Sequence, residues 1–323
     1  MNDVGKKLLI RRRVFPVSYP AIGVALVIVA VSFVTLGPLL TLLLRSFKVR
    51  VPQSDSFIYG IQNWLRVFSE PNLLNAVVNS LFIALAVFFL STALAILFAW
   101  VVTRTDIPCK GVIELALWTG FFLPLTSQAL GWILLFDPSN GLVNQVLQKI
   151  PFIKGSLNIY SYGGIIWTHV AFATSARFIL ISPAFKRMDP ALEEAARMSG
   201  SSFTQTLFSI TIPVLAPSIL ASAFLGFIKA LESFEVELLL GLPAGIYVYS
   251  TKIFEVVTDR KAVVDFEGAA ALGSLFLLVI FALFLVYRRL LGNREFVTVS
   301  GRGFQPRVTP LGKWRWVITA LCW

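Results

Sequence analysis

Ionisable and amide side chains inside otherwise apolar stretches are the residues of this chain that could do chemistry. Lys229 and Glu232 lie three positions apart, so on a helix they share one face and can neutralise each other. Glu235 follows closely, and Gln128 lies in another apolar stretch. Such groups are costly in an apolar medium and normally face a bundle interior or a wet cavity. Two hypotheses stay open for them, an internal polar contact for packing and the lining of a solute pathway.

Covalent and metal chemistry find little support in the sequence. His169 is the only histidine, Cys109 and Cys322 are the only cysteines, and no nucleophile–base set or metal-ligand spacing occurs. No G-x-x-x-x-G-K-[ST] loop occurs either, so any ATPase must be a partner protein. We therefore expect no enzyme, no cofactor and no metal, and we expect His169 to make a hydrogen bond between helices.

The composition indicates which elements position these groups. Of 323 residues, 57% are hydrophobic and only 14% are charged, and the mean hydropathy is +0.79. A soluble domain of this length could not bury so much apolar surface, so the expected class is an all-α polytopic membrane protein. Six apolar runs are long enough to cross a bilayer, namely 19–44, 74–102, 112–136, 163–185, 214–240 and 267–290.

The charge distribution predicts the orientation and the ends of the chain. The net charge is +11, but Lys and Arg concentrate in the segments on one side of alternating spans, which argues for the positive-inside rule and against nucleic acid. We expect 1–18 to be a basic cytoplasmic tail, 19–290 the transmembrane domain in contact with lipid, 291–313 a basic cytoplasmic linker, and 314–323 the start of a further apolar segment. The alternative for that last segment is a natural end anchored at the membrane interface by Trp314, Trp316 and Trp323.

Three single residues carry further expectations. Pro124 removes one backbone hydrogen bond and should bend the third span, near which Gln128 serves either as a pathway residue or as a hydrogen bond between helices. Arg177 lies toward the inner end of the fourth span, where we expect its stem to extend so that the guanidinium reaches the headgroups.

The stretch 189–213 carries its own helix signals between two apolar runs. Asp189 can cap a helix, Pro190 suits its first position, and Gly200 can end it in a left-handed conformation. A capping box at Ser202 and Gln205 predicts a second short helix, closed by a proline. On the first helix we expect a packing face of Leu192, Ala195, Ala196 and Ser199, and an ion pair between Glu193 and Arg197. The alternative is an ordinary interhelical loop.

The same stretch resembles the EAA motif of ABC importer permeases. That pattern is EAA, three residues, G, nine residues and I-x-L-P, and this chain departs from it only with isoleucine for leucine near the end. The start of the second run (Asn79-Ser80) and its finish (residues 104–108, RTDIP) are similar to the same family. The matching positions and their neighbour, which the resemblance assigns to coupling with the ATPase, are Glu193, Glu194, Ala195, Ala196, Gly200, Ile210, Ile212 and Pro213.

The resemblance implies a MetI-like bundle of six transmembrane helices in the type I ABC importer family. The chain is most similar to the N-terminal half of the iron(III)-type fused permeases of the bacterial inner membrane. The implied partners are ABC ATPase subunits, a periplasmic or lipid-anchored solute-binding protein, and a second permease half, fused or separate. The implied solute is iron(III) or a small organic cation, and the pathway candidates are Gln128, Lys229, Glu232 and Glu235. An ion-coupled secondary transporter is the alternative, with a membrane scaffold ranked after it.

Overall fold

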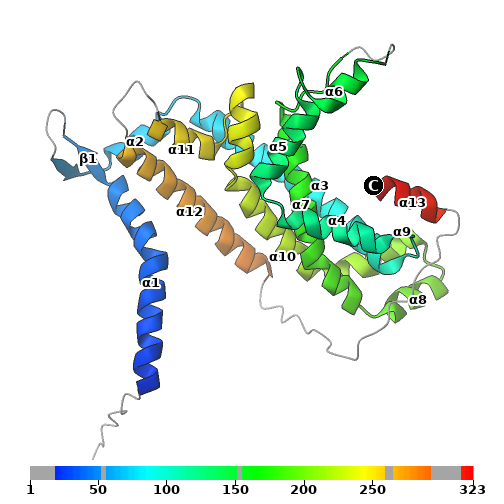
Figure 1. Cartoon of the computed structure of the whole chain (residues 1–323). Coiled ribbons are helices and arrows are strands. Elements are labelled where there is room, and N and C mark those ends of the chain that lie inside the picture. Colours follow the sequence, from blue (N-terminus) through cyan, green and yellow to red (C-terminus); the bar gives the residue numbers. More distant parts are fainter. Residues whose placement is uncertain (1–18, 52–55, 151–154, 259–264, 292–313, 323) are drawn as a thin grey trace, which may run out of the picture.

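The computed structural model describes residues 19–51, 56–150, 155–258, 265–291 and 314–322. Within these ranges the chain is almost entirely helical, apart from one short hairpin (Figure 1). The long helices are α1 (Tyr19–Ser46), α3 (Leu73–Arg104), α7 (Tyr162–Arg187), α10 (Ile212–Leu231) and α12 (Phe266–Leu291). The expected tail 1–18 and nearly all of the expected linker 291–313 lie outside the described residues.

Five helical stretches of the described chain are long and apolar enough to cross a membrane. They are α1 from Gly23, α3, α7, the continuous stretch Phe203–Leu231, and α12 to Arg289. A sixth crossing results if the bent pair α4 (Lys110–Phe122) and α5 (Leu125–Phe136) counts as one span. The protein is thus a multi-pass membrane protein of the expected all-α class.

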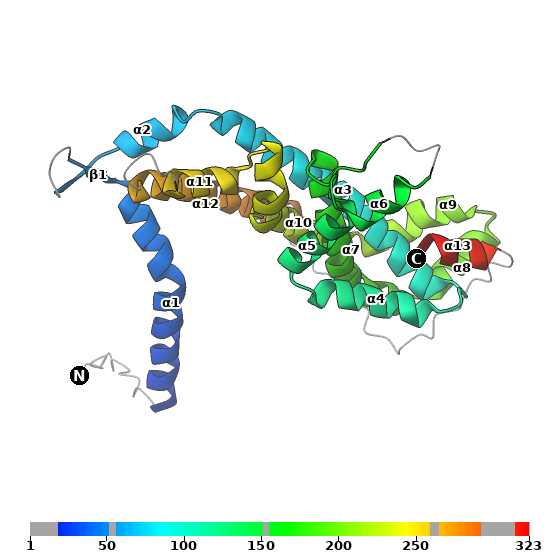
Figure 2. The same ribbon diagram turned by 45° about the horizontal axis from the view of Figure 1, so that its top comes forward.

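The centre of the bundle consists of α3, α7 and α10, with α4 packed on α7 (Figures 1 and 2). One face of α3 bears fully buried small residues, including Ala84, Ala95 and Ala99, and Phe178 and Phe185 of α7 pack in the cluster around the last two. Small side chains allow helix backbones to approach closely, and the large rings then fill the remaining space. This pairing of small and large residues holds α3 against α7.

Helix α1 stands apart from the rest of the body (Figures 1 and 2). It contacts α12 and the hairpin of β1 (Lys48–Arg50) and β2 (Phe57–Tyr59), and its most apolar window contains no buried residue. α2 (Gln62–Phe68) and α11 (Tyr249–Thr258) lie at this end of the bundle, which we call the α11 end. The opposite end carries α8 (Pro190–Met198), and we call it the α8 end.

The third expected span is not one helix. α4 and α5 meet at an angle of 109°, because Pro124 has an extended backbone and precedes the first residue of α5. The Gln128 amide donates to the carbonyl oxygens of Gly120 at 2.6 Å and Leu123 at 3.3 Å. It thereby satisfies acceptors that the break leaves without a helical partner. The bend at Pro124 was predicted, but its angle of 109° was not. The sequence also did not predict that Gln128 would bond to the backbone of its own broken span.

The fifth expected span was placed wrongly at both of its ends. The helix begins at Phe203 instead of near residue 214 and ends at Leu231 instead of Leu240, after which the chain turns through η2 (Glu237–Gly241) and η3 (Leu242–Ala244). α9 (Phe203–Thr206) runs through the π-helical turn η1 (Leu207–Thr211) directly into α10.

The π turn also explains why Pro213 does not close a separate helix, as had been expected. Within η1 the Ile212 N–H binds the Leu207 carbonyl five residues back. A wider turn of this kind relieves the clash that a proline ring makes with the preceding turn. The second short helix is therefore the first part of the membrane-crossing helix itself.

Polar contacts order the loops of the α11 end. Asp137 accepts hydrogen bonds from the backbone N–H groups of Ser139 and Asn140, which form a tight turn before α6 (Leu142–Leu147). The pKa of Asp137 is lowered mainly because its carboxylate accepts these two backbone hydrogen bonds, and the bond from Asn140 has the larger effect. Burial and then a hydrogen bond to Asp137 raise the pKa of Tyr160. The ionised carboxylate is thus part of this turn.

The last described helix is α13 (Trp314–Cys322), which lies beside α9 and α4 at the α8 end (Figure 2). Its Ile318 packs against the cluster that contains Ala99 and Phe185, whereas Trp314 and Trp316 are exposed. Trp323 lies outside the described residues. The expectation that this segment begins a further apolar run stays a prediction.

Candidate coupling site and cavity

Helix α8 begins and ends at the residues that the sequence predicted. The Asp189 carboxylate accepts a hydrogen bond from the Ala191 N–H at 2.9 Å, and Pro190 occupies the first position. Gly200 has φ +86°, and the backbone N–H groups of Gly200 and Ser201 bind the last free carbonyls of the helix. No atom lies within 4 Å of a Cβ built at Gly200, so the backbone conformation alone requires glycine.

The capping box that restarts the chain is also confirmed. The Ser202 hydroxyl accepts from the Gln205 N–H, and the Gln205 side chain accepts from the Ser202 N–H at 2.8 Å. α8 and α9 are therefore joined by a short connection that is hydrogen-bonded on both sides of Gly200. Such a connection fixes the angle between the two helices.

The face of α8 that packs on the protein differs from the expected one. Glu193 and Ala196 are buried, whereas Leu192, Ala195 and Ser199 are exposed. Met198 is the most exposed large apolar side chain of the described residues, at 89%. The predicted packing face thus contributes only Ala196 to the interior. The rest of it forms an exposed, largely apolar surface at the α8 end.

Glu193 was expected to pair with Arg197 on another face of α8, but it is buried and pairs with Arg104. Its carboxylate lies 3.5 Å from Nε of Arg104 and accepts a hydrogen bond from Thr211 at 2.9 Å. Arg104 also donates to the Met188 carbonyl at 3.1 Å. The side chains of Arg104 and Glu193 are only 2% and 9% exposed. This buried cluster connects the ends of α3 and α7, α8, and the turn that starts α10.

Of the other predicted coupling residues, some lie on the buried side of the segment 189–213 and others on its exposed side. Ile210 and Ile212 are partly buried and pack against the cluster that contains Phe178 and Phe185. Glu194 is half-buried, and Pro213 is exposed. The isoleucines therefore hold the segment on the bundle. The pairing of Arg104 with Glu193 was missed, although an arginine at the end of an apolar helix was a usable signal for an inward carboxylate.

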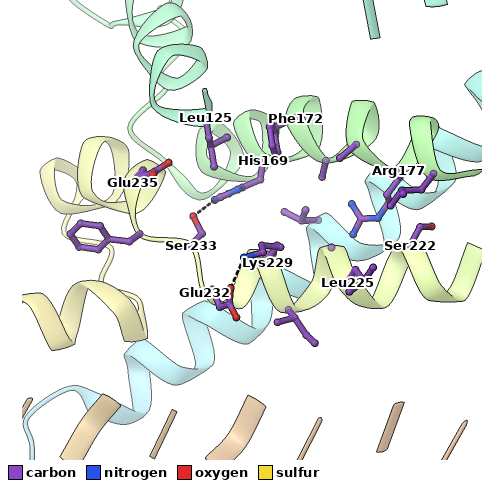
Figure 3. Close-up of a pocket in the computed structure, with 18 residues that line it drawn as sticks. Leu125, His169, Phe172, Arg177, Ser222, Leu225, Lys229, Glu232, Ser233 and Glu235 are labelled. Atoms are coloured by element: carbon purple, nitrogen blue, oxygen red, sulfur yellow. Dashed lines mark hydrogen bonds and ion pairs between the residues drawn. The ribbon is translucent and has the colours of Figure 1, made fainter. Parts of the chain in front are cut away.

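A cavity of about 540 Å³ lies mainly between α7 and α10, and Figure 3 shows its lining. Lys229, Glu232 and Glu235 all line it, so three of the four predicted pathway residues are brought together. Gln128 is not among the residues that line it. Lys229 and Glu232 form the predicted ion pair at 2.9 Å. Because the Lys229 side chain is largely exposed, this pair contributes little to stability.

Arg177 lines the same cavity, and the expectation that it reaches toward the headgroups is wrong. Its guanidinium is buried and donates to the Ser91 hydroxyl and, at 3.4 Å, to the Ala223 carbonyl. A Cβ at Gly226 would lie 2.6 Å from Cζ of Arg177, so glycine provides the space for the guanidinium. A neighbouring helix without a side chain at this point allows the arginine to turn inward.

His169 makes the expected hydrogen bond between helices. Its Nε2 lies 2.8 Å from Oε1 of Glu237, and Ser233 donates to the other carboxylate oxygen at 2.7 Å. His169 and Glu237 are both buried, and the cluster fastens α7 to η2. Glu237 could not be assigned this partner from the sequence, because the two residues are 68 positions apart.

Curated relatives of the chain are permease proteins. Two named for ferric transport are FbpB 1 of Haemophilus influenzae, 25% identical over 88% of this chain, and FbpB of Actinobacillus pleuropneumoniae, 26% identical over 80% of it. The chain spans only 43% and 37% of their lengths. The sulfate transport system permease protein CysT of Salmonella typhimurium is 26% identical over 82% of this chain and 89% of its own. No protein-family model matches.

Solved structures show the same fold. A bacterial alginate ABC transporter, in complex with an alginate pentasaccharide-bound periplasmic protein, contains a chain that superposes with a TM-score of 0.69. The superposition covers 87% of this chain and 96% of that one, at 20% sequence identity. At that identity the likeness shows the fold alone, and it extends across nearly the whole of the neighbour.

Proposed function

We propose that this chain is a permease subunit of a type I ABC importer, that it forms one half of the solute path, and that it couples to a separate ATPase through 189–213. One observation carries the coupling role. α8 is fixed to the bundle on one face by Arg104 and Glu193 and presents Ala195 and Met198 on the other. Its small and unbranched exposed residues allow close approach of a partner surface. A rigid exposed helix anchored to several spans is what force transmission requires.

The buried cluster gives this transmission a physical route. Glu193 lies on α8, while its partners lie on α3 and at the start of α10. A displacement of α8 by a closing ATPase pair would therefore act directly on α3 and α10, and α3 packs along α7. The three helices would then rotate largely as one body, which is the motion expected for alternating access.

The remaining assignments complete the proposal. The partners are two ABC ATPase subunits, a periplasmic or lipid-anchored solute-binding protein, and a second permease half. The membrane is the bacterial inner membrane, with the N-terminus cytoplasmic, as the distribution of Lys and Arg favours. Iron(III) is one candidate solute because two relatives are named for ferric transport, but a third is named for sulfate. These ions have opposite charges, so the relatives alone do not select the solute.

Two glycines provide a matched test of the coupling role. Gly200 and Gly245 have φ of +86° and +70°, and neither has an atom within 4 Å of a built Cβ. Valine therefore introduces comparable backbone strain at both sites, but only Gly200 adjoins α8. We expect Gly200→Val to reduce co-purification of the ATPase subunits and solute-stimulated ATP hydrolysis, and Gly245→Val to leave both intact.

The control and the contradicting outcomes are specific. Both variants must insert in the membrane to the same level as the unaltered chain. Glu194→Lys adds a charge change on the same helix and should act like Gly200→Val. Equal ATPase retention by the Gly200 and Gly245 variants would contradict the coupling role of 189–213. Transport that persists in vanadate would favour the ion-coupled carrier instead.

A further inference from the structure

Arg177 is a cation in the middle of the bundle. At about 1.5 Å per residue it lies about 22 Å along α7 from Tyr162 and about 15 Å from Arg187. Only 1% of the surface of Arg177 is exposed. Among the described residues, no carboxylate lies within ion-pair distance of it, and its Nε is buried without a hydrogen-bond partner. A buried membrane cation without a counter-charge is expensive, so it indicates a functional contact.

The surroundings hold this guanidinium in position without neutralising it. One terminal nitrogen donates to Ser91 of α3 and the other to the Ala223 carbonyl of α10. Both acceptors are uncharged, and both fix the planar group between helices. Arg177 is also one of the residues that line the cavity, and its Nε is held there without a hydrogen-bond partner. An arginine arranged in this way is suited to bidentate recognition of an oxyanion.

The other charges of the cavity leave the region of Arg177 positive. Lys229 and Glu232 neutralise each other, and Nε2 of His169 is engaged by Glu237. Glu235 is exposed to solvent. Figure 3 shows Glu232 and Glu235 toward one end of the lining and Arg177 toward the other. A cavity of about 540 Å³ is also within the range of small-molecule sites.

We propose that this cavity is a site at which the solute binds during transport, and that Arg177 binds an anionic oxygen group of the solute, such as a carboxylate, sulfate or phosphate. The inference rests on the proposed transport function and names the chemistry of its substrate. It favours an anionic solute over a small organic cation. Because a lipid phosphate offers the same chemistry as a free anion, the test has to separate these sources.

Two leucines of α10 permit a matched labelling experiment. Leu225 lines the cavity and is 54% exposed, whereas Leu220 is 53% exposed and is not among the lining residues. Each is changed to cysteine in a full-length chain whose Cys109 and Cys322 are replaced by serine. The detergent-solubilised chain is then labelled with sulfonatoethyl and with trimethylammonioethyl methanethiosulfonate, which are anionic and cationic. The measured quantity is the ratio of their reaction rates.

The positive charge of Arg177 should raise the ratio for the anionic reagent by about tenfold at Leu225→Cys relative to Leu220→Cys. Arg177→Gln should abolish this preference, and Arg177→Lys, which keeps the charge, should retain part of it. Labelling at Leu220→Cys should be the same in all three backgrounds, which controls for changes of reactivity outside the cavity. A ratio at Leu225→Cys that does not change with Arg177→Gln would overturn the proposal.

Competition then identifies the source of the anion. Sodium sulfate should slow labelling at Leu225→Cys more than sodium chloride of equal ionic strength, in a detergent that contains no phosphate. Protection only in phosphatidylglycerol nanodiscs, with no effect of sulfate, would assign Arg177 to a lipid headgroup and overturn the proposal. Loss of the anionic preference in the assembled transporter would assign it to a carboxylate of the second half, with the same consequence. Either failure would leave the Gly200 test of coupling unaffected.

Discussion

Replacing Glu193 by glutamine should remove one charge from the buried cluster while leaving its shape in place. The amide oxygen can still accept the hydrogen bond that Thr211 donates at 2.9 Å. Arg104 would then be a buried guanidinium that keeps its hydrogen bond to the Met188 carbonyl but loses its carboxylate. The change therefore isolates the charge pairing from the packing of α8.

The exposure of the two side chains sets the magnitude. At 2% and 9% exposure the pair is effectively buried, and removing one partner of a buried pair costs about 3–5 kcal/mol. Lys186 and Glu114 provide a comparison, because they join α7 and α4 at 2.9 Å with side chains 50% and 31% exposed. For such an exposed pair, Glu114→Gln should cost about 0.2–1 kcal/mol.

The assay is reversible unfolding of the detergent-solubilised chain, followed for both single variants and for the uncharged pair Arg104→Met with Glu193→Leu. The double variant should recover most of the loss, since an apolar pair of similar volume is often as stable as a buried ion pair. The difference between the double variant and the sum of its own two single changes, Arg104→Met and Glu193→Leu, measures the coupling. Equal, small losses for Glu193→Gln and Glu114→Gln would refute the reasoning.

Three further outcomes are expected. Gly226→Ala places a Cβ against the guanidinium of Arg177, so it should displace that group and reduce the anionic labelling preference in the cavity, whereas a change only in expression level would contradict this. Gln128→Leu leaves the carbonyls at the break between α4 and α5 without their amide donor and should lower the free energy of unfolding by about 1–3 kcal/mol, without changing labelling in the cavity. Burial opposes ionisation of Lys252, but its bonds to two carboxylates outweigh this and its pKa is raised. Its stabilising effect is complete below the ordinary lysine pKa of about 10.4 and is lost as pH rises through the raised value, so the melting temperatures of Lys252→Met and the unaltered chain should converge only in strong alkali.

The helix-capping signals in the sequence were reliable, because each capping interaction spans only a few residues. Asp189, Gly200 and the Ser202–Gln205 capping box act within one or two turns, so their residue types determine the helix ends directly. The apolar runs were found for a similar reason, because the length of a span is set by the bilayer thickness. These features could therefore be predicted without knowing how the helices pack against each other.

The errors concern contacts between distant segments and the response of the backbone to proline. The burial of Glu193 depends on Arg104, which comes from another helix, and helical periodicity alone could not reveal it. Arg177 turns inward because Gly226 on a different helix leaves room for it. Pro124 and Pro213 look alike in sequence, but a 109° break forms at the first, while a π turn accommodates the second. Only the surrounding structure distinguishes these outcomes.

The buried charges have a common consequence for how the bundle can move. Arg104 with Glu193, Arg177 with its two acceptors, and His169 with Glu237 lie at successive depths between α3 or α7 and the chain segment from α8 to η2. Sliding α7 along α10 by one turn would separate Arg177 from the Ala223 carbonyl and His169 from Glu237 in an apolar medium, where unpaired charges are most costly. Arg104 with Glu193 ties α3 to α8 in the same way. Such sliding is therefore disfavoured, and α3, α7 and α10 should respond to a force on α8 as one rigid unit. In the proposed importer, access to the cavity would then change by rotation of this unit against α1 and α12 or against the second half.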